Sequence, residues 1–404
     1  MRRGHDFEYR SRGRSRSSSW LLPDISWARF DWIVFGLAAF LLGTGLMFVK
    51  ACFDANLDYG RMDLSAGSPF RSHLKIVTIS TPVFLAGLYM RPVWLRKQSY
   101  LIYGAGIFLL LLVPVIGIEL NNAKRWLSTP IGFNLQPSEL MKIALVLALA
   151  KALYRNRLQT FTSWILPSLI ALVPMAMIMK QPDLGTSLTI VPVTLGMFYL
   201  AGARARIIIG LCLAAGALGF VSWQAGLVKD YQLRRIDTWA RAFDPDVLIG
   251  ERNAAAFHTY HARTTIGNGG MDGSGIGQGI ANTAGHLPAK ESDSIWSVVA
   301  EELGFVNSSA VLLAYALFAM LLLRGAGELR DRFSRLVVGG VGLYFGAHFF
   351  IHIGVNTGLL PMTGLTLPLF STGGSSMIAS FGALGVALGL SARRVAALDA
   401  DAFR

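Results

Sequence analysis

The sequence has few cysteines, few charged residues and no repeat of short period. Only two of its 404 residues are cysteines, Cys52 and Cys212, which excludes a disulfide framework, and neither has other metal-ligating residues around it. We expect Cys212 to pack inside a membrane span. Charged residues make up 15% of the chain against 53% hydrophobic residues, and the mean hydropathy is +0.48. These values exclude an ordinary soluble protein of this length.

Apolar runs long enough to cross a bilayer recur along the whole chain. We predict an all-α integral membrane protein with about ten transmembrane helices and no separate soluble domain. The fourth and fifth spans are short, so we expect them to tilt or to include flanking residues. The membrane domain covers residues 31–391, between a basic tail (1–30) and a C-terminal tail (392–404). The expected spans are 31–51, 74–90, 100–118, 139–153, 165–179, 186–203, 205–224, 295–323, 335–356 and 374–391.

The formal net charge is +13, and the basic residues gather in alternate loops. With ten spans these clusters all fall on one side, which the positive-inside rule makes cytoplasmic. Both termini are then inside, and the long loop 225–294 is outside. We expect no nucleic-acid partner, because nothing except the charge supports one. The clusters are Arg2, Arg3, Arg10, Arg12, Arg14 and Arg16; Arg91, Arg96 and Lys97; Lys151, Arg155 and Arg157; Arg204 and Arg206; Arg324, Arg330, Arg332 and Arg335; Arg393 and Arg394.

The N-terminal tail, from Met1 to Trp20, is rich in Arg and Ser. We expect it to be disordered and held near anionic membrane lipids. We do not expect a signal peptide, because the apolar segment beginning near Asp31 has full span length and shows no cleavage site.

The junction between the outer loop and the eighth span carries Asp293, in the stretch Leu287-Pro-Ala-Lys-Glu-Ser-Asp-Ser-Ile-Trp296. A carboxylate here lies at the membrane–water boundary, where its charge is tolerated and its pKa is easily tuned. Asp293 is therefore the leading candidate for chemistry. The structural alternative makes it the N-cap of the eighth span.

Two helix starts broken by Pro or Gly converge on the same outer side. The first is Gln136-Pro-Ser-Glu-Leu-Met-Lys142, in which Pro137 suits a helix start, Ser138 can cap it, and Glu139 and Lys142 share a face. Taken alone, this motif fits a capped helix with a surface ion pair as well as it fits a site. The second is Lys180-Gln-Pro-Asp-Leu-Gly-Thr186. Two such helix starts on one side of the membrane favour a shared site over two unrelated helix caps.

The ninth span carries His348, His352 and Asn356 at i, i+4 and i+8, on one helical face. Such a pair of histidines can ligate a metal, but we favour hydrogen bonding across the bundle. The following loop, 357–376, is rich in Gly and Pro, and irregular backbone at membrane depth belongs where it lines a cavity. Backbone N–H groups near Gly373 and Gly374 would suit a phosphate.

The glycine-rich stretch 267–279 superficially matches a dinucleotide-binding fingerprint. We reject that interpretation, because no strand–helix–strand unit surrounds it. We expect a close-packed, flexible loop beside the site.

These motifs together resemble the SEDS family (RodA, FtsW and SpoVE). They come in the family's order and cover nearly all of the membrane region. The resemblance implies a ten-span peptidoglycan glycosyltransferase in the cytoplasmic (inner) membrane that polymerises lipid II on the outer face. It also implies a class B penicillin-binding protein and other elongation or division proteins as partners, and it maps the family's catalytic aspartate onto Asp293. The matching blocks are Lys124-Arg-Trp126, Gln136-Pro-Ser-Glu139, Gln181-Pro-Asp-Leu-Gly-Thr186, Asp293 with Glu301-Glu-Leu-Gly304, and Gly358-Leu-Leu-Pro361 through Gly373-Gly-Ser-Ser376.

The chain departs from the family pattern close to Asp293, which leaves altered substrate or activity open. The branch is also open. Gln181-Pro-Asp-Leu-Gly-Thr186 favours the elongation type, whereas Val355-Asn-Thr-Gly-Leu-Leu-Pro361 with Gly364-Leu-Thr-Leu-Pro368 favours the division type. In this chain, Ala289 stands where the family has Glu, Glu291 where it has His, Ser294 where it has Phe, Asn122 where it has Gly, His352 where it has Asn and Thr372 where it has Tyr. The stretch 247–265 also departs from the family pattern.

The expected chemistry requires one essential carboxylate. Asp293 would act as general base on a sugar hydroxyl, and the lipid-linked pyrophosphate leaves without a general acid. Cations, with a divalent ion such as Mg²⁺ or Mn²⁺ as a further candidate, would stabilise the pyrophosphate. The predicted substrate-binding residues are Arg125, Gln136, Ser138, Glu139, Lys142, Asp183, Thr186, Arg234, Lys290, Glu302, Asn356, Ser371, Gly373, Gly374 and Ser375.

Two other functions stay open beside the enzyme. A lipid II flippase or other transporter would be expected to place ionisable residues near the bilayer midplane and to show internal repeats. Here the charged motifs gather on the outer face and no repeat is seen. A catalytically inactive scaffold of a cell-wall complex is compatible with the altered residues around Asp293.

Overall fold

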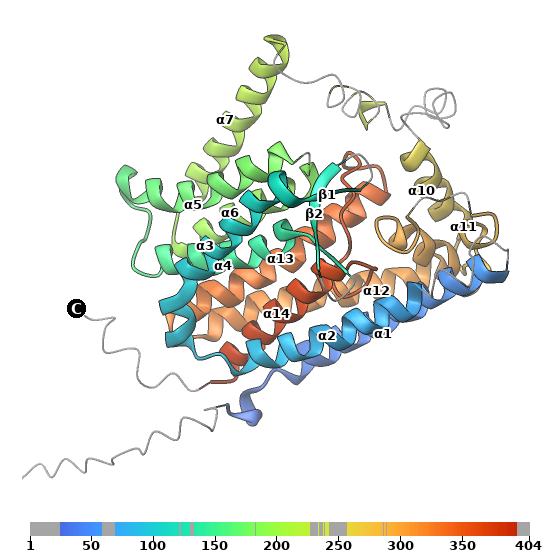
Figure 1. Ribbon diagram of the computed structural model, residues 1–404, viewed down its shortest axis with the longest axis horizontal. Coiled ribbons are helices and arrows are strands. Elements are labelled where there is room, and N and C mark those ends of the chain that lie inside the picture. The colour runs from blue at the N-terminus through green and yellow to red at the C-terminus, as the bar shows by residue number, and fades with distance from the viewer. Residues whose placement is uncertain are drawn as a thin grey trace, which may run out of the picture.

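The computed structural model describes residues 25–58, 69–120, 123–129, 133–181, 183–226, 233, 237, 239–241, 257–285, 287 and 289–393. Most of its helices form one bundle, with a small sheet beside it (Figure 1). The elements are η1 (Trp27–Arg29), α1 (Trp32–Asp58), α2 (Pro69–Tyr89), α3 (Pro92–Ile116), β1 (Ile118–Leu120), β2 (Ala123–Ser128), β3 (Asn134–Leu135), α4 (Pro137–Leu153), α5 (Phe161–Lys180), α6 (Leu184–Ala201), α7 (Ala205–Gln224), α10 (Phe257–Asn268), α11 (Ile280–Thr283), α12 (Ile295–Glu328), α13 (Arg332–Asn356) and α14 (Gly374–Ser391).

Every expected span coincides with a helix, α1 to α7 or α12 to α14. Within the described ranges, seven helices are long and apolar enough to cross a membrane: α1, α3, α5, α7, α12, α13 and α14. Helix α6 is apolar but shorter. Helix α4 is buried along most of its length, so its surface faces protein rather than lipid. The chain is a helical protein with several membrane-length apolar helices.

The all-α prediction is wrong for the segment between α3 and α4. Three short antiparallel strands lie there in the order β1-β2-β3, with Leu127 paired with Leu135. Gly117 is the C-cap of α3, and Pro137 is the first residue of α4, so the segment between them lies outside both helices. Strand pairing then satisfies backbone N–H and C=O groups that a helix would otherwise satisfy.

Close backbone approach joins α14 to α2. A Cβ atom at Gly385 or Gly389 would overlap the carbonyl of Phe84 or Leu88. Small residues allow helices to approach in this way inside membranes. Helix α14 also contacts α4, on whose first turn part of the site described below lies.

Helix α7 projects from the bundle (Figure 1), and none of its residues is buried. Cys212 lies on α7, which coincides with a predicted span, but its side chain is exposed. The prediction that Cys212 packs against other helices is therefore wrong. Cys52, on α1, is buried.

The glycine-rich stretch 267–279 is hydrogen-bonded to a kink in α12. Gly304 has a left-handed φ of 71° inside that helix. Around the kink, the N–H groups of Ser274 and Gly275 donate to the carbonyls of Glu301 and Glu302, both at 3.0 Å. Gly269, Gly273 and Gly279 pack closely against α12, but most of the other residues of the stretch are exposed. The expected position beside the site is wrong, because the stretch contributes no residue to the cavity described below.

Candidate active site

A polar cavity of about 290 Å³ lies where the first turns of α4, α6 and α14 meet strand β2 and the turn before α12. Loop residues 364–366 and 372–373 complete its wall. Helix N-termini carry unpaired N–H groups and a partial positive charge, so three of them around one cavity favour an anionic ligand. The lining residues are Arg125, Trp126, Gln136, Glu139, Asp183, Thr186, Ala289, Ser292, Asp293, Gly364, Leu365, Thr366, Thr372, Gly373, Gly374, Ser375 and Ser376.

Asp293 occupies a tight turn that precedes α12. The turn begins at Ala289, whose φ of 47° is left-handed, and the N–H groups of Ser292 and Ser294 donate to its carbonyl at 3.0 and 3.2 Å. Ser294, not Asp293, is the N-cap of α12. The capping interpretation of Asp293 is therefore wrong, because the turn carries its side chain into the cavity.

The environment of Asp293 alters its acidity. Burial raises the pKa of the Asp293 carboxyl above its ordinary value, and the nearby Glu291 acts in the same direction. A hydrogen bond from Ser292 and the positive charge of Arg125 partly oppose this rise in pKa. A carboxylate whose pKa is shifted toward neutrality accepts a proton more readily than an ordinary surface carboxylate.

Two segments hold the backbone around Asp293. The N–H and the Oγ1 of Thr372 both donate to the carbonyl of Glu291, at 2.9 and 2.8 Å. The Nδ2 of Asn356 donates to the Asp293 carbonyl at 3.1 Å, and its Oδ1 accepts from Ser297 at 2.9 Å. The Asp293 Oδ2 lies 3.4 Å from the position that a Cβ would take at Gly364. The turn is thus fixed from α13 and from the loop that follows it.

Asp183 joins the two Pro/Gly-broken helix starts. Its Oδ2 accepts hydrogen bonds from Gln136 Nε2 (2.7 Å), Ser138 Oγ (3.1 Å) and Thr186 Oγ1 (2.9 Å). Its Oδ1 lies 3.8 Å from Arg125 Nη1. The prediction that Ser138 caps α4 is wrong, because the N-cap is Gln136 and the Ser138 hydroxyl points to Asp183 instead. This network places the Arg125 guanidinium at the cavity.

Glu139 and Lys142 form an ion pair of 2.8 Å. The alternative of a surface pair is wrong, because Glu139 is 5% exposed and Lys142 is 3% exposed. The Lys142 Nζ also lies 2.7 Å from His348 Nε2. His348 and His352 therefore make hydrogen bonds between elements, as we favoured, since His352 Nδ1 lies 2.8 Å from the Leu365 carbonyl in the cavity loop.

The start of α14 faces the cavity through Gly373, Gly374 and Ser375. The Ser375 hydroxyl accepts from the N–H of Gln136 at 2.7 Å and so joins α14 to the start of α4. The proposed phosphate-binding backbone near Gly373 and Gly374 thus belongs to the same wall as Gln136.

The predicted site residues separate into four groups. Ser138, Lys142 and Asn356 lie behind the wall and bond to residues of the site. Lys290, Glu302 and Ser371 are buried and do not line the cavity. Glu302 instead accepts from Asn282 at 2.6 Å and fastens α11 to α12. Arg234 lies outside the described residues. The cavity-lining group consists of Asp293, Arg125, Gln136, Glu139, Asp183, Thr186, Gly373, Gly374 and Ser375.

Some lining residues were not predicted as site residues. Trp126 belongs to the block Lys124-Arg-Trp126, and Gly364 and Thr366 belong to the irregular loop expected to line a cavity. Their positions within these motifs could have identified them as cavity residues from the sequence. Ala289, Ser292, Leu365, Thr372 and Ser376 complete this group.

Comparisons with known proteins agree with the motifs. The family model described as a cell cycle protein, for FtsW, RodA and SpoVE, matches residues 31–395. The chain is 37% identical over 293 residues to the probable peptidoglycan glycosyltransferase FtsW of Geobacter metallireducens, covering 71% of this chain and 74% of that protein. It is 31% identical over 362 residues to the protein of the same name from Methylomonas methanica, covering 86% and 88%.

Solved structures share the fold. A chain from a peptidoglycan synthase complex, described as coordinating polymerization and crosslinking, matches with a TM-score of 0.74 and 28% identity over 90% of this chain and 98% of that one. The rod shape determining protein RodA of Thermus thermophilus matches with a TM-score of 0.65 and 26% identity over 90% and 97%. This chain, with its cavity built from the shared motifs, belongs to the FtsW, RodA and SpoVE family of cell cycle proteins.

Proposed function

We propose that this chain is a peptidoglycan glycosyltransferase that polymerises lipid II on the outer face of the cytoplasmic membrane. The observation that carries the proposal is the Asp293 carboxylate, which lines a polar cavity together with Arg125 and has a raised pKa. The relatives named as probable peptidoglycan glycosyltransferases support the same activity.

Asp293 acts as the general base of the transfer. An acceptor sugar hydroxyl gives its proton to the carboxylate while its oxygen bonds to the anomeric carbon of the donor. The bond from that carbon to the pyrophosphate oxygen breaks, and its electron pair leaves with the lipid-linked pyrophosphate. Because this leaving group is already a stable anion, no second carboxyl group has to protonate it.

Arg125 and the first turn of α14 stabilise the pyrophosphate. Arg125 is oriented by Asp183, and Gly373, Gly374 and Ser375 bring a helix N-terminus to the same cavity. Preorganised cations and N–H groups of this kind act on developing negative charge without reorganising. Lys142 contributes indirectly, since its ammonium is buried and paired with Glu139.

The residues present do not fit a protein-bound divalent cation. The Asp183 Oδ2 accepts three side-chain hydrogen bonds, and one oxygen of Glu139 is paired with Lys142. Across the described residues, no group of three His, Cys, Asp or Glu side chains is arranged to hold a metal. We therefore assign no step to Mg²⁺ or Mn²⁺ held by the protein.

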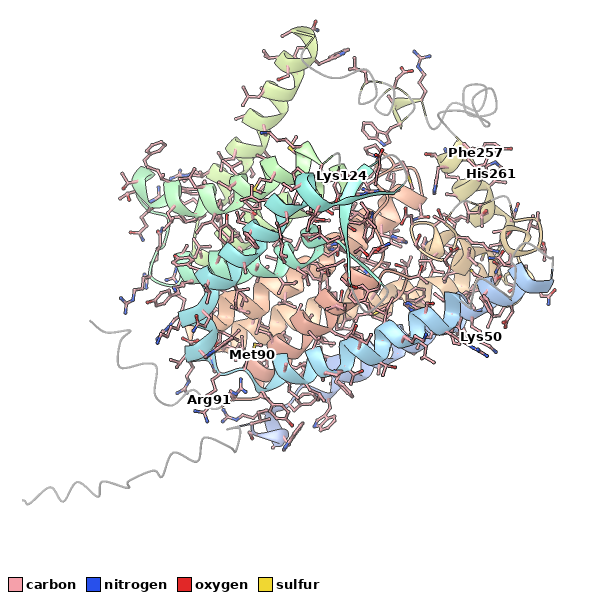
Figure 2. All side chains as sticks on the ribbon, in the orientation of Figure 1. Lys50, Met90, Arg91, Lys124, Phe257 and His261 are labelled. Carbon is pink, nitrogen blue, oxygen red and sulfur yellow. The ribbon has the colours of Figure 1, made fainter. Side chains whose placement is uncertain are left out.

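All of α1 to α7 and α12 to α14 cross the membrane in this proposal, with both termini in the cytoplasm. Figure 2 supports the arrangement, because Met90 and Arg91 lie at one end of the bundle and Lys50, Phe257 and His261 lie toward the other. Helix α4 crosses despite its charged residues, because it is shielded by neighbouring helices. Helix α2 carries Arg71 and Lys75 near its start, where long side chains reach the interface.

The partner in this proposal is a class B penicillin-binding protein, whose transpeptidase crosslinks the glycan product. The structural similarity to a synthase complex that coordinates polymerization and crosslinking supports this partner. The two curated relatives are both named FtsW, which favours the division complex over the elongation complex.

The deciding experiment is lipid II polymerisation by the purified full-length chain with its cognate transpeptidase, comparing wild type with Asp293→Asn. We expect the variant to lose about 10²–10⁴ in rate and to retain partner binding, measured by co-purification. Asp54→Asn, at an exposed carboxylate of α1, is the matched control. Normal polymerisation by Asp293→Asn would refute its role as the base. An inactive wild-type complex would instead favour the scaffold.

A further inference from the structure

A cluster of buried polar groups lies behind the wall of the cavity. Lys142 on α4 is 3% exposed and His348 on α13 is 1% exposed. The Lys142 Nζ lies 2.8 Å from Glu139 Oε1 and 2.7 Å from His348 Nε2. The Lys142 ammonium is therefore held from its own helix and from a neighbouring one.

The hydrogen-bond partners assign the proton on His348. Its Nδ1 lies 2.9 Å from the backbone carbonyl of Tyr344, and a carbonyl only accepts, so Nδ1 carries the hydrogen. The ammonium of Lys142 only donates, so His348 Nε2 offers its lone pair. His348 is then a neutral imidazole with a fixed tautomer, in which one ring nitrogen sets the role of the other.

This tautomer has a consequence for Glu139. Because His348 accepts one N–H of Lys142, the ammonium stays where a second N–H reaches Glu139 Oε1. Glu139 itself lines the cavity. One of its carboxylate oxygens is thus paired with Lys142, and the other is buried with no hydrogen-bond partner among the described residues.

The same cluster reaches a second part of the cavity wall. The Tyr344 hydroxyl lies 3.2 Å from Ser380 Oγ, which donates to the Ser376 carbonyl at 2.6 Å. Ser376 lines the cavity from α14. Hydrogen bonds from α13 therefore support both the α4 side and the α14 side of the site.

We propose that His348 is a positioning residue for glycosyl transfer: as a neutral acceptor it fixes Lys142, and through Lys142 it holds Glu139 in the cavity wall. This inference rests on the proposed function. His348 itself does not line the cavity, so it acts through other residues rather than on substrate. Displacement of a site carboxylate by about 1 Å is enough to lower a rate by about a hundredfold.

The first test measures polymerisation by the full-length chain with its transpeptidase partner. We expect His348→Leu, which removes the acceptor, to lower kcat at least about tenfold. His348→Gln keeps an acceptor oxygen and should restore most of the rate. The double variant His348→Leu with Lys142→Met should be no slower than Lys142→Met alone, because both changes break one chain of contacts.

His73→Leu is the matched control. His73 is also a buried histidine, but neither ring nitrogen has a hydrogen-bond partner within the described part of the chain. Its loss removes a buried imidazole without breaking a hydrogen bond between described residues, so the rate should stay near wild type. Equal losses in His348→Gln and His348→Leu, or multiplicative losses in the double variant, would mean that His348 only fills space, and the proposal would fall.

The second test does not depend on activity. Nitrogen NMR of histidine-labelled protein, with His348→Gln used to assign the signal, should show a neutral His348 with hydrogen on Nδ1. A hydrogen on Nε2, or a charged imidazolium, would overturn the proposal even if polymerisation is confirmed. If the wild-type complex fails to polymerise, the proposed function fails, and the NMR result still decides whether His348 accepts from Lys142.

Discussion

Asp293 carries a charge that its surroundings disfavour, since burial raises the pKa of its carboxyl. The folded protein then holds this proton more tightly than the unfolded chain does. Its contribution to stability therefore falls as pH rises from the unfolded pKa through the folded pKa. We predict that Asp293→Asn has a higher Tm than wild type at neutral pH. The difference should shrink as the pH falls toward about 4, the ordinary value for Asp.

Thermal unfolding in detergent across this pH range measures the effect. The polymerisation rate of wild type should rise with pH through the same raised pKa, because the base must be ionised. A Tm difference that does not vary with pH would contradict the raised pKa.

The ion pair of Glu139 and Lys142 is predicted to matter for folding as well as for activity. Glu139→Ala leaves the buried ammonium of Lys142 without its counter-charge, which costs about 3–5 kcal/mol. The exposed pair of Lys50 and Asp54, with side chains 61% and 50% exposed, is the matched control. Asp54→Asn should cost about 0.2–1 kcal/mol. Denaturant unfolding of both variants in the same detergent measures the contrast, and similar losses would mean that water reaches Lys142.

At the scale of elements, the loop between α13 and α14 positions the turn that carries Asp293. Thr372→Val removes the 2.8 Å hydrogen bond to the Glu291 carbonyl but keeps the shape of the side chain. We predict a fall in kcat of about ten- to a hundredfold, with little change in KM, because the general base shifts while the substrate contacts remain. Steady-state polymerisation kinetics measure both constants.

Thr372→Ser should recover most of this loss, since it restores the hydroxyl. Thr357→Val is the control, because the Thr357 hydroxyl donates at 2.8 Å to Ile353 within its own helix and does not line the cavity. A loss in Thr372→Ser as large as that in Thr372→Val would show that the methyl group, not the hydroxyl, matters.

At the scale of the whole molecule, the topology predicts which loops a reagent outside the cell can reach. In a chain without Cys52 and Cys212, a cysteine near position 250, outside the described residues, should react with a membrane-impermeant thiol reagent in intact cells. Met271→Cys, at an exposed side chain of the outer loop, should react as well. Gly327→Cys, near the end of α12, should react only after the cells are opened. Labelling of Gly327→Cys in intact cells would contradict the ten-span arrangement.

The sequence by itself located the ten long apolar helices, though not α10 and α11, and it singled out Asp293, which lines the cavity. Ten apolar segments predicted α1 to α7 and α12 to α14. Such segments can be recognised locally, because a membrane helix satisfies all of its backbone hydrogen bonds within one apolar segment. The motifs around Gln136, Asp183, Asp293 and Gly373 identified the cavity wall, because each lies at a helix start. The short strands β1 to β3 were missed, because β1 pairs with β2 at three positions and β2 with β3 at two, which is too short for a recognisable alternating pattern.

Only the tertiary structure decided how these residues meet. The spacing of Glu139 and Lys142 predicts a shared helix face, but whether that face meets lipid, water or protein depends on how α13 packs against it. Asp183 receives hydrogen bonds from residues more than forty positions away, and Thr372 holds a carbonyl 81 positions before it. Hydrogen bonds and burial depend on distances in space, whereas local sequence patterns determine only the elements that carry the residues.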